Sequence, residues 1–258
     1  VGANFSNNRI KSAAPDEFSV DYFDEDQKKI QSNLVDNNAE LFLLYTPKRN
    51  LFGYGVKRQY GKNLYPSFLL SLQKGLEVGD GDTNYGKLLF SYNQPIKLGK
   101  FGIINSTIET GKIFGATQLS ALSPVPANQT YSLVPNTFSL LNYYDFVVDE
   151  FVVGHFIHHF NGFILNRIPL IKKLKLRSVA VFRGVIGNIS DQNKAINRSS
   201  ITYNAPTELY YEYGFGFENI GFGNLRIFRV DFIWRSESTN LNTSAPNFGI
   251  RLGLLPAF

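Results

Sequence analysis

The sequence predicts an all-β fold, and in particular a transmembrane antiparallel β-barrel of which about ten strands lie in this chain. Three observations lead to this prediction. Strand-length runs alternate between two kinds of side chain, long and short connectors alternate along the chain, and the final run carries glycine and apolar residues at regular spacing. The chain could hold a whole barrel or the C-terminal part of a larger one.

The strands begin after a different N-terminal segment. Residues 1–38 are polar and include six acidic residues between Asp16 and Asp26, so we expect a non-membrane segment with one short helical turn. Residues 39–258 are expected to form the barrel. The predicted strands are 40–47, 51–60, 65–78, 84–94, 101–112, 150–161, 174–187, 209–219, 225–235 and 247–255. Most have about 9–11 residues, the length with which a tilted strand crosses a bilayer.

The run from Thr207 to Ser238 shows the alternation most clearly. Read with period two, one face of each strand is aromatic and the other carries charges and glycines. A membrane barrel turns the aromatic face to lipid and the polar face to its lumen, the reverse of a soluble sandwich. The residues predicted to face lipid are Tyr211, Tyr213, Phe215, Phe217, Phe228, Phe232 and Trp234. Those predicted to face the lumen are Glu212, Glu218, Arg229, Asp231, Arg235 and Arg251.

The connectors differ in length in a regular way. Residues 236–246 and 188–206 are long and polar, and 113–149 is the longest connector, whereas 162–173 is compact and 220–224 and 95–100 are short turns. Long loops at one end of the strands and shorter turns at the other are typical of outer-membrane barrels. If the C-terminus lies in the periplasm, the long loops are extracellular.

The last run, NFGIRLGLLPAF, is typical of a terminal barrel strand that the assembly machinery captures by strand addition. Asn247, Gly249, Leu252 and Leu254 have the expected spacing, and the chain ends in the aromatic Phe258. Pro256 departs from the pattern. The other interpretation is an ordinary final strand of a soluble domain.

Composition excludes several classes of protein. Lysine and arginine total 26 against 21 acidic residues, and they are scattered except for Lys172, Lys173, Lys175 and Arg177, so a nucleic-acid groove is not predicted. Without cysteine there is no disulfide framework or thiol catalysis. No run reaches the length of about 18 apolar residues that a transmembrane helix needs. The chain has no methionine, so we expect a processed product or a fragment of a longer protein.

No catalytic, cofactor or metal site is predicted. The only three histidines are His155, His158 and His159, and on a strand the first and last are about 13 Å apart while His158 points the other way. The sequence GFGFENIGFG lacks the spacing of a phosphate loop and precedes a strand instead of a helix. No serine lies in a nucleophile-elbow motif. We therefore expect a protein that is not an enzyme.

Two stretches carry a family resemblance. They are FSLLNYYDFVVDEFVVGHFIHHFNGFILNRIPLIKKLKLRSV and YYEYGFGFENIGFGNLRIFRVDFIWR. They resemble the C-terminal part of a Bacteroidota outer-membrane family with an N-terminal carboxypeptidase-regulatory-like β-sandwich and a C-terminal barrel. The matching residues are Asn142–Phe146, Asp149, His158–Phe160, Gly162–Phe163, Ile168–Leu170, Lys172–Arg177, Gly214–Asn219 and Arg229–Asp231.

The final strands also resemble those of BamA-type assembly barrels. The counterpart of that group's Val-Arg-Gly lid-loop motif is Phe182–Val185, within a predicted strand. The resemblances imply a bacterial outer-membrane protein with a structural, assembly or transport role in a complex. Its expected partners are outer-membrane lipid and other outer-membrane or periplasmic proteins, and no cofactor is expected. The alternative is a secreted, soluble all-β binding or adhesion module.

Overall fold

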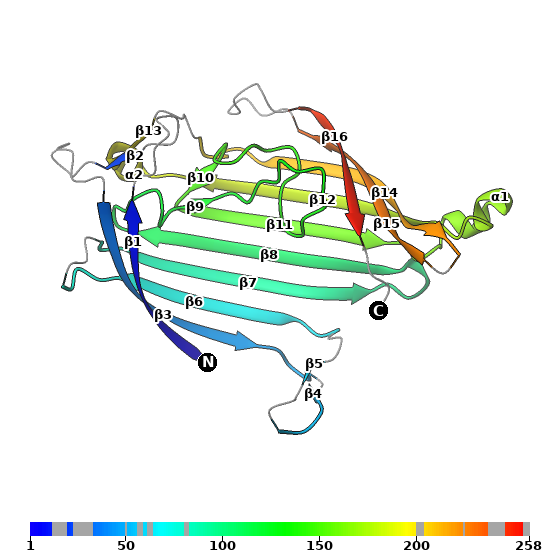
Figure 1. Ribbon diagram of the computed structural model, residues 1–258, viewed down its shortest axis with the longest axis horizontal. Coiled ribbons are helices and arrows are strands. Elements are labelled where there is room, and N and C mark those ends of the chain that lie inside the picture. Colours follow the sequence, from blue (N-terminus) through cyan, green and yellow to red (C-terminus); the bar gives the residue numbers. More distant parts are fainter. Residues whose placement is uncertain are drawn as a thin grey trace.

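The computed structural model describes residues 1–11, 20–22, 33–49, 51–55, 59–60, 64–79, 83–199, 204–223, 225–236 and 246–254. Its main element is a ten-stranded sheet in which neighbouring strands are antiparallel (Figure 1). The order is β1 (Gly2–Lys11), β3 (Asn33–Tyr45), β6 (Ser67–Gly75), β7 (Gly86–Lys97), β8 (Ile103–Phe114), β11 (Glu150–His159), β12 (Arg177–Asn188), β14 (Tyr210–Phe222), β15 (Leu225–Arg235) and β16 (Phe248–Leu254). The predicted all-β class is confirmed.

Strand direction turns steadily across this sheet, from β8 to the steeply inclined β1 and β16 (Figure 1). Such a turn is the expected twist of a large antiparallel sheet. Among the described residues β1 and β16 do not pair with each other, so the sheet is open and the chain does not form a closed barrel by itself. The free side of β16 instead meets a loop, because the amide of Leu252 donates to the Tyr131 carbonyl and the Leu252 carbonyl accepts from Leu133.

All but one of the predicted strands lie in this sheet. The exception is 51–60, which forms a two-stranded ribbon of β4 (Leu51–Phe52) and β5 (Gln59–Tyr60) instead of one strand. Gly53 and Gly55 between them have φ of 97° and 57°, a backbone region that glycine adopts without a steric cost. Both glycines lie between β4 and β5, where the sequence predicted a continuous strand.

The boundary predicted at residue 38 is wrong for the sheet, because it falls inside β3 and omits β1. The two strands pair from Gly2 opposite Phe42 to Lys11 opposite Asn33. Polar residues occupy both faces of β1 (NFSNNR), so the strand has no hydrophobic period to reveal it. The helical turn expected before residue 38 falls largely on residues 23–32, which lie outside the described residues.

Connectors alternate between the two ends of the sheet, as an antiparallel meander requires. One end has η3 (Gly99–Phe101), the β14–β15 turn, and the β11–β12 connector with η4 (Leu165–Arg167) and α1 (Pro169–Lys172). The other end has α2 (Asp191–Ile196) and β13 (Asn197–Ser199), which pairs with β2 (Val20–Tyr22). The predicted alternation holds here, although the 46–66 connector with β4 and β5 is also long. No helix among the described residues has the length and apolar character to cross a membrane.

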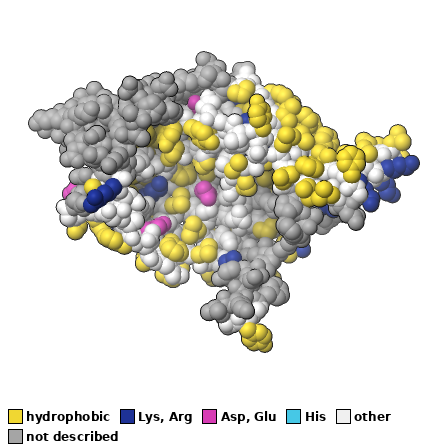
Figure 2. Space-filling view, in the orientation of Figure 1, with side chains coloured by type: hydrophobic (Ala, Val, Ile, Leu, Met, Phe, Trp, Pro, Cys, Tyr) yellow, Lys and Arg dark blue, Asp and Glu magenta, His cyan; other side chains and the backbone are white. Residues whose placement is uncertain are grey.

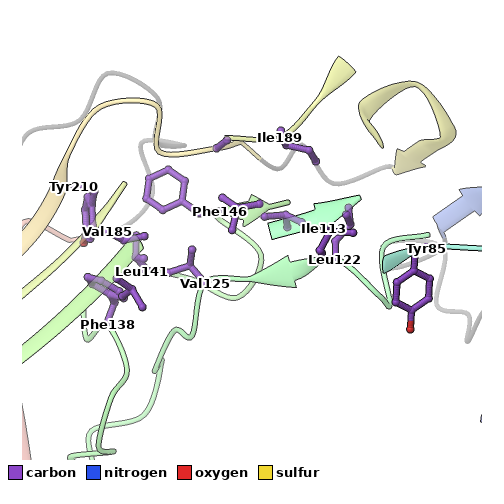
Figure 3. Close-up of a cluster of buried hydrophobic side chains, with 14 residues drawn as sticks. Tyr85, Ile113, Leu122, Val125, Phe138, Leu141, Phe146, Val185, Ile189 and Tyr210 are labelled. Atoms are coloured by element: carbon purple, nitrogen blue, oxygen red, sulfur yellow. The ribbon is translucent and has the colours of Figure 1, made fainter. Parts of the chain in front are cut away.

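The apolar core lies between the sheet and residues 115–149, which we call the inward connector. This segment contains β9 (Ser123–Pro124) and β10 (Val147–Val148) and packs on the sheet face that we call inner. Phe138 and Phe146 of the connector each lie 5.5 Å from the Tyr210 ring of β14, measured between ring centroids (Figure 3). Burying such side chains stabilises a fold by about 1.5–3 kcal/mol each, so the connector is an integral part of the structure.

Candidate functional site

The two faces of the sheet differ in the way that period two predicted. On the inner face Glu212 and Asp231 are fully buried, Arg229, Glu218 and Arg251 are also buried, and Arg235 is half-buried. On the opposite, outer face Tyr213 and Phe215 are each 49% exposed. The other aromatic candidates on that face are at least partly exposed, namely Tyr211, Phe217, Phe228, Phe232 and Trp234. The structure therefore places the predicted charged residues and the predicted aromatic residues on opposite faces.

Glu212 of β14 is the centre of the buried polar network. Its carboxylate accepts hydrogen bonds from the backbone amides of Ser139 and Leu140 at 2.8 and 2.7 Å. The Tyr210 hydroxyl donates to it at 3.1 Å, and Arg183 of β12 forms an ion pair with it at 3.3 Å. A fully buried carboxylate is costly unless its lone pairs are satisfied, and four donors satisfy this one. Glu212 thereby fixes the connector to the sheet.

Ser139 of the inward connector joins two arginines from different strands. Arg183 donates to its hydroxyl, and Arg251 of β16 donates to its carbonyl. Arg251 also donates to the Ile250 carbonyl at 3.0 Å. One turn of the connector therefore links β12, β14 and β16, whose positions in the sequence are far apart.

Arg229 and Asp231 of β15 form a second buried pair on the same face. The guanidinium donates to both carboxylate oxygens, at 2.8 and 2.7 Å. Space for the carboxylate exists because residue 216 opposite is glycine: a Cβ there would lie 2.2 Å from an Asp231 oxygen. Arg235, at the end of β15, donates to Asn247 at 3.0 Å. The six predicted charged residues thus lie on one face. Glu212 and Arg251 belong to the Ser139 cluster, Arg229 and Asp231 pair with each other, Arg235 bonds to Asn247, and Glu218 contacts His159.

The other end of the inward connector is held by Asp149. Its carboxylate accepts from the amide and hydroxyl of Ser190 at 2.9 and 2.6 Å and from the Asn193 side chain at 2.8 Å. The Asn193 side chain in turn accepts from the Thr117 amide at 2.9 Å. These bonds tie the start and end of the connector to α2 and its N-cap residue.

Two titratable groups outside the strands of the sheet have displaced pKa values. Burial raises the pKa of the Tyr85 phenol, and the neighbouring Asp36 carboxylate raises it further. Burial also raises the pKa of the Asp145 carboxyl in the inward connector, although hydrogen bonds from Asn142 act in the opposite direction. The Tyr85 hydroxyl donates a hydrogen bond to Asp36 at 3.4 Å, and Asp145 accepts one from the Asn142 amide at 2.7 Å.

The histidines do not converge. The His155 ring packs 5.3 Å from that of Phe138, and a ring nitrogen of His158 lies 2.8 Å from the Phe101 carbonyl. His159 lies 2.8 Å from a Glu218 oxygen. Among the described residues, no three histidine, aspartate or glutamate side chains are grouped so that they could hold a metal ion.

A cavity of about 220 Å³ separates part of the inward connector from the inner face. Leu122, Val125 and Pro126 line it on the connector side, and Lys87 and Glu109 line it on the sheet side. Its remaining walls are mainly apolar. The polar side chains of its lining are those of Lys87, Glu109 and Ser123.

The predicted assembly residues lie mainly on the last strand. Gly249, Leu252 and Leu254 belong to β16, which pairs with β15 from Phe248 opposite Trp234 to Leu254 opposite Phe228. Asn247 precedes it and accepts the bond from Arg235. Phe258 falls outside the described residues.

Sequence reasoning did not find Ser139, and it considered Arg183 only as part of a loop motif. An arginine between Val181 and Val185, two valines of the same strand face, was a usable signal, because an inward charge in an apolar row needs a partner. Ser139 gave no such signal, because its contacts with Arg183 and Arg251 depend on how the connector folds.

Comparison with known proteins adds a family but no activity. No curated protein matches the sequence. The profile of a family of unknown function, described as the DUF5686 C-terminal domain, matches residues 5–192, which run from β1 into α2. Because this match covers more than half of the chain, the protein belongs to the DUF5686 C-terminal domain family.

Proposed function

We propose that the chain is the C-terminal part of a transmembrane β-barrel in a bacterial outer membrane, with a structural or assembly role in a complex. The observation that carries this proposal is the inverted polarity of the sheet. Charged side chains are buried on its inner face, and large apolar side chains are exposed on its outer face. A barrel in lipid needs this arrangement, whereas a soluble sandwich needs the opposite one.

The apolar surface is continuous across strands. Cross-strand neighbours form an aromatic row from β11 to β16, made of Phe156, Phe182, Tyr213, Trp234 and Phe248. A second row includes Leu43, Phe90, Val152 and Ile186, which are between 37% and 49% exposed. Soluble monomers rarely expose apolar patches beyond a few hundred Å², so these rows favour a lipid environment.

The inward connector favours a role other than an open solute channel. It covers the inner face beside β12, β14 and β16, and the Glu212 network holds it there. The unpaired edge of β1, and the edge of β16 beyond its contact with the Tyr131–Leu133 segment, favour further barrel strands in the whole protein, because an unpaired strand edge in lipid leaves backbone groups unsatisfied. The resemblance to Bacteroidota outer-membrane proteins supports the same location, with lipid and other envelope proteins as partners and no enzymatic activity.

Cell fractionation of the full-length protein tests the proposal. We expect it in the outer-membrane fraction, resistant to carbonate extraction and released as a monodisperse species only by detergent. Folded barrels keep a compact, faster-migrating form in unheated gel samples, and we expect this form to disappear on boiling. Monodisperse protein in the soluble fraction without detergent would contradict the barrel and favour the secreted binding module instead.

A further inference from the structure

Three connectors at one end of the sheet form a single surface, which we call the cationic turn surface. They are residues 97–102, 160–177 and 219–226, which comprise the β7–β8, β11–β12 and β14–β15 connections with the adjoining strand ends. Arg226 donates to the Leu174 carbonyl at 2.6 Å, and Asn219 donates to the Lys175 carbonyl at 2.6 Å. The Phe101 and Phe163 rings meet edge to face at 4.8 Å. These contacts join all three connectors.

The charge on this surface has one sign. Its basic residues are Lys97, Lys100, Arg167, Lys172, Lys173, Lys175, Arg177 and Arg226, and none of the three segments contains aspartate or glutamate. Of these, all but Arg226 are exposed. The adjoining Glu218 is buried on the inner face and contacts His159. A surface of this kind attracts anions over a distance of about a Debye length.

The same turns expose large apolar side chains. Phe222 is 93% exposed, Leu170 79%, Leu225 62% and Leu174 55%. Figure 2 shows lysine and arginine side chains beside hydrophobic ones on the projection that carries α1. A soluble anion or an acidic protein surface would account for the charges but would leave these apolar side chains in water. A binding partner that contacts both the basic and the apolar side chains must carry phosphates beside hydrocarbon. The interface of an anionic bilayer has this composition.

The position of the turns agrees with this assignment. Each turn continues directly from strands with an apolar outer face, so in a membrane-spanning sheet the turns lie where the hydrocarbon ends. Lysine can extend its charged end toward headgroups while its methylene groups stay on apolar surface.

We propose that the cationic turn surface binds the phosphates of anionic glycerophospholipids, with Leu170, Leu174 and Phe222 inserted at the edge of the acyl chains. This inference rests on the proposed membrane location, and on placing the short turns on the periplasmic side, where the inner leaflet consists of glycerophospholipids. It adds a lipid class and a binding surface to that proposal.

The test compares two triple variants of the full-length detergent-solubilised protein. The first is Lys172→Gln, Lys173→Gln and Lys175→Gln on the surface. The matched control is Lys74→Gln, Lys112→Gln and Lys194→Gln, which removes the same charge from exposed lysines at the opposite end of the sheet. Native mass spectrometry then measures retention of phosphatidylglycerol and phosphatidylcholine with identical acyl chains.

We expect the wild type and the control to retain more phosphatidylglycerol than phosphatidylcholine. In the first variant, the ratio of retained phosphatidylglycerol to phosphatidylcholine should fall by at least roughly tenfold. A further variant, Leu170→Asn with Phe222→Ser, should retain less of both lipids. Equal loss in the two lysine variants, or equal retention of the two lipids by the wild type, would overturn the proposal. If inorganic phosphate displaced the phosphatidylglycerol completely, the surface would be a site for anions and not for lipid. A preference for lipid A would place the surface in the outer leaflet. Either result would overturn the proposal.

Sedimentation with vesicles separates this inference from the proposed barrel. A protein that is soluble without detergent but sediments with phosphatidylglycerol vesicles and not with phosphatidylcholine vesicles would disprove the barrel and keep the lipid surface. A protein that inserts into both kinds of vesicle, with no lipid preference in mass spectrometry, would keep the barrel and disprove the lipid surface.

Discussion

The two halves of the sheet share an outer face and differ on the inner one. In the half from β1 to β7, Leu41 and Leu72 are cross-strand neighbours and 51% and 46% exposed, close to the 49% of Phe215 in the other half. On the inner face, Glu40 of the first half is only partly buried and accepts a bond from Ser71 at 2.6 Å. Glu212 of the second half is fully buried.

This difference comes from the inward connector and not from the strands. Both halves have the same antiparallel pairing and the same alternation of faces. Residues 115–149 lie mainly over the second half, where they exclude water and supply backbone amides to Glu212, and they touch the first half at Lys87 of β7. A glutamate on the inner face is therefore partly exposed at position 40 in one half and a buried structural group at position 212 in the other. Substitutions at matched positions should measure this difference.

The largest effect is expected from removing the edge strand of the covered half. Deleting Asn247–Phe258 removes β16, leaves β15 as an open edge, and takes away the partners of Tyr131, Leu133 and Ser139. We expect membrane insertion to be abolished, with a protease-sensitive periplasmic product. Deleting 1–11, which removes β1 from the opposite edge, should leave more inserted protein, because β1 bonds to Asn38 and Asn37 of β3, whereas β16 also holds the inward connector. Deleting 256–258 should be milder still; immunoblots of protease-treated membranes compare the three.

Next in size is the loss of a buried carboxylate. Glu212→Ala leaves Arg183 and two amides of the connector without their partner, and breaking a buried ion pair in this way costs about 3–5 kcal/mol. Glu40→Ala in the uncovered half should cost less than about 1 kcal/mol, since water replaces the lost contact. Urea unfolding in lipid vesicles measures both. Similar costs for the two substitutions would show that the connector does not create the difference.

A third comparison concerns the outer face. Phe215→Arg puts a charge in the middle of β14, which costs about 2–4 kcal/mol if that position faces the centre of a bilayer. Phe222→Arg makes the same change at the end of the strand, where the cost falls to about 0–1 kcal/mol. The fraction folded in vesicles reports both. If the two variants fold equally well, Phe215 does not face hydrocarbon.

The smallest effect is expected from Asp145 in the inward connector. Because its pKa is raised in the folded state, the folded protein binds more protons than the unfolded chain, so stability falls as pH rises from the ordinary carboxyl pKa to the raised value. Asp145→Asn keeps an acceptor for the Asn142 amide and removes the titration. We expect it to flatten the pH dependence of urea unfolding in that window. If the slope of the unfolding free energy against pH did not change, another group would be responsible for the pH dependence.

The sequence predicts a residue's position where polar and apolar side chains alternate regularly along a strand, and it fails where they do not. The faces of β14 and β15 follow from alternation alone, because successive side chains of a strand point to opposite sides. The same reasoning located β16, but not its pairing with β15. It failed for β1, where both faces are polar, and for 51–60, where two glycines lie between β4 and β5.

The sequence by itself determined the all-β class, most strand positions and the opposite faces of the predicted charged and aromatic residues, because each depends on local periodicity and turn residues. Tertiary structure alone decided that residues 115–149 turn inward, that Ser139 joins Arg183 to Arg251, and that β16 meets the Tyr131–Leu133 segment. These contacts join residues up to 121 positions apart, as between Tyr131 and Leu252. Their energy depends on burial that exists only after the connector has packed on the sheet, so no local pattern records them.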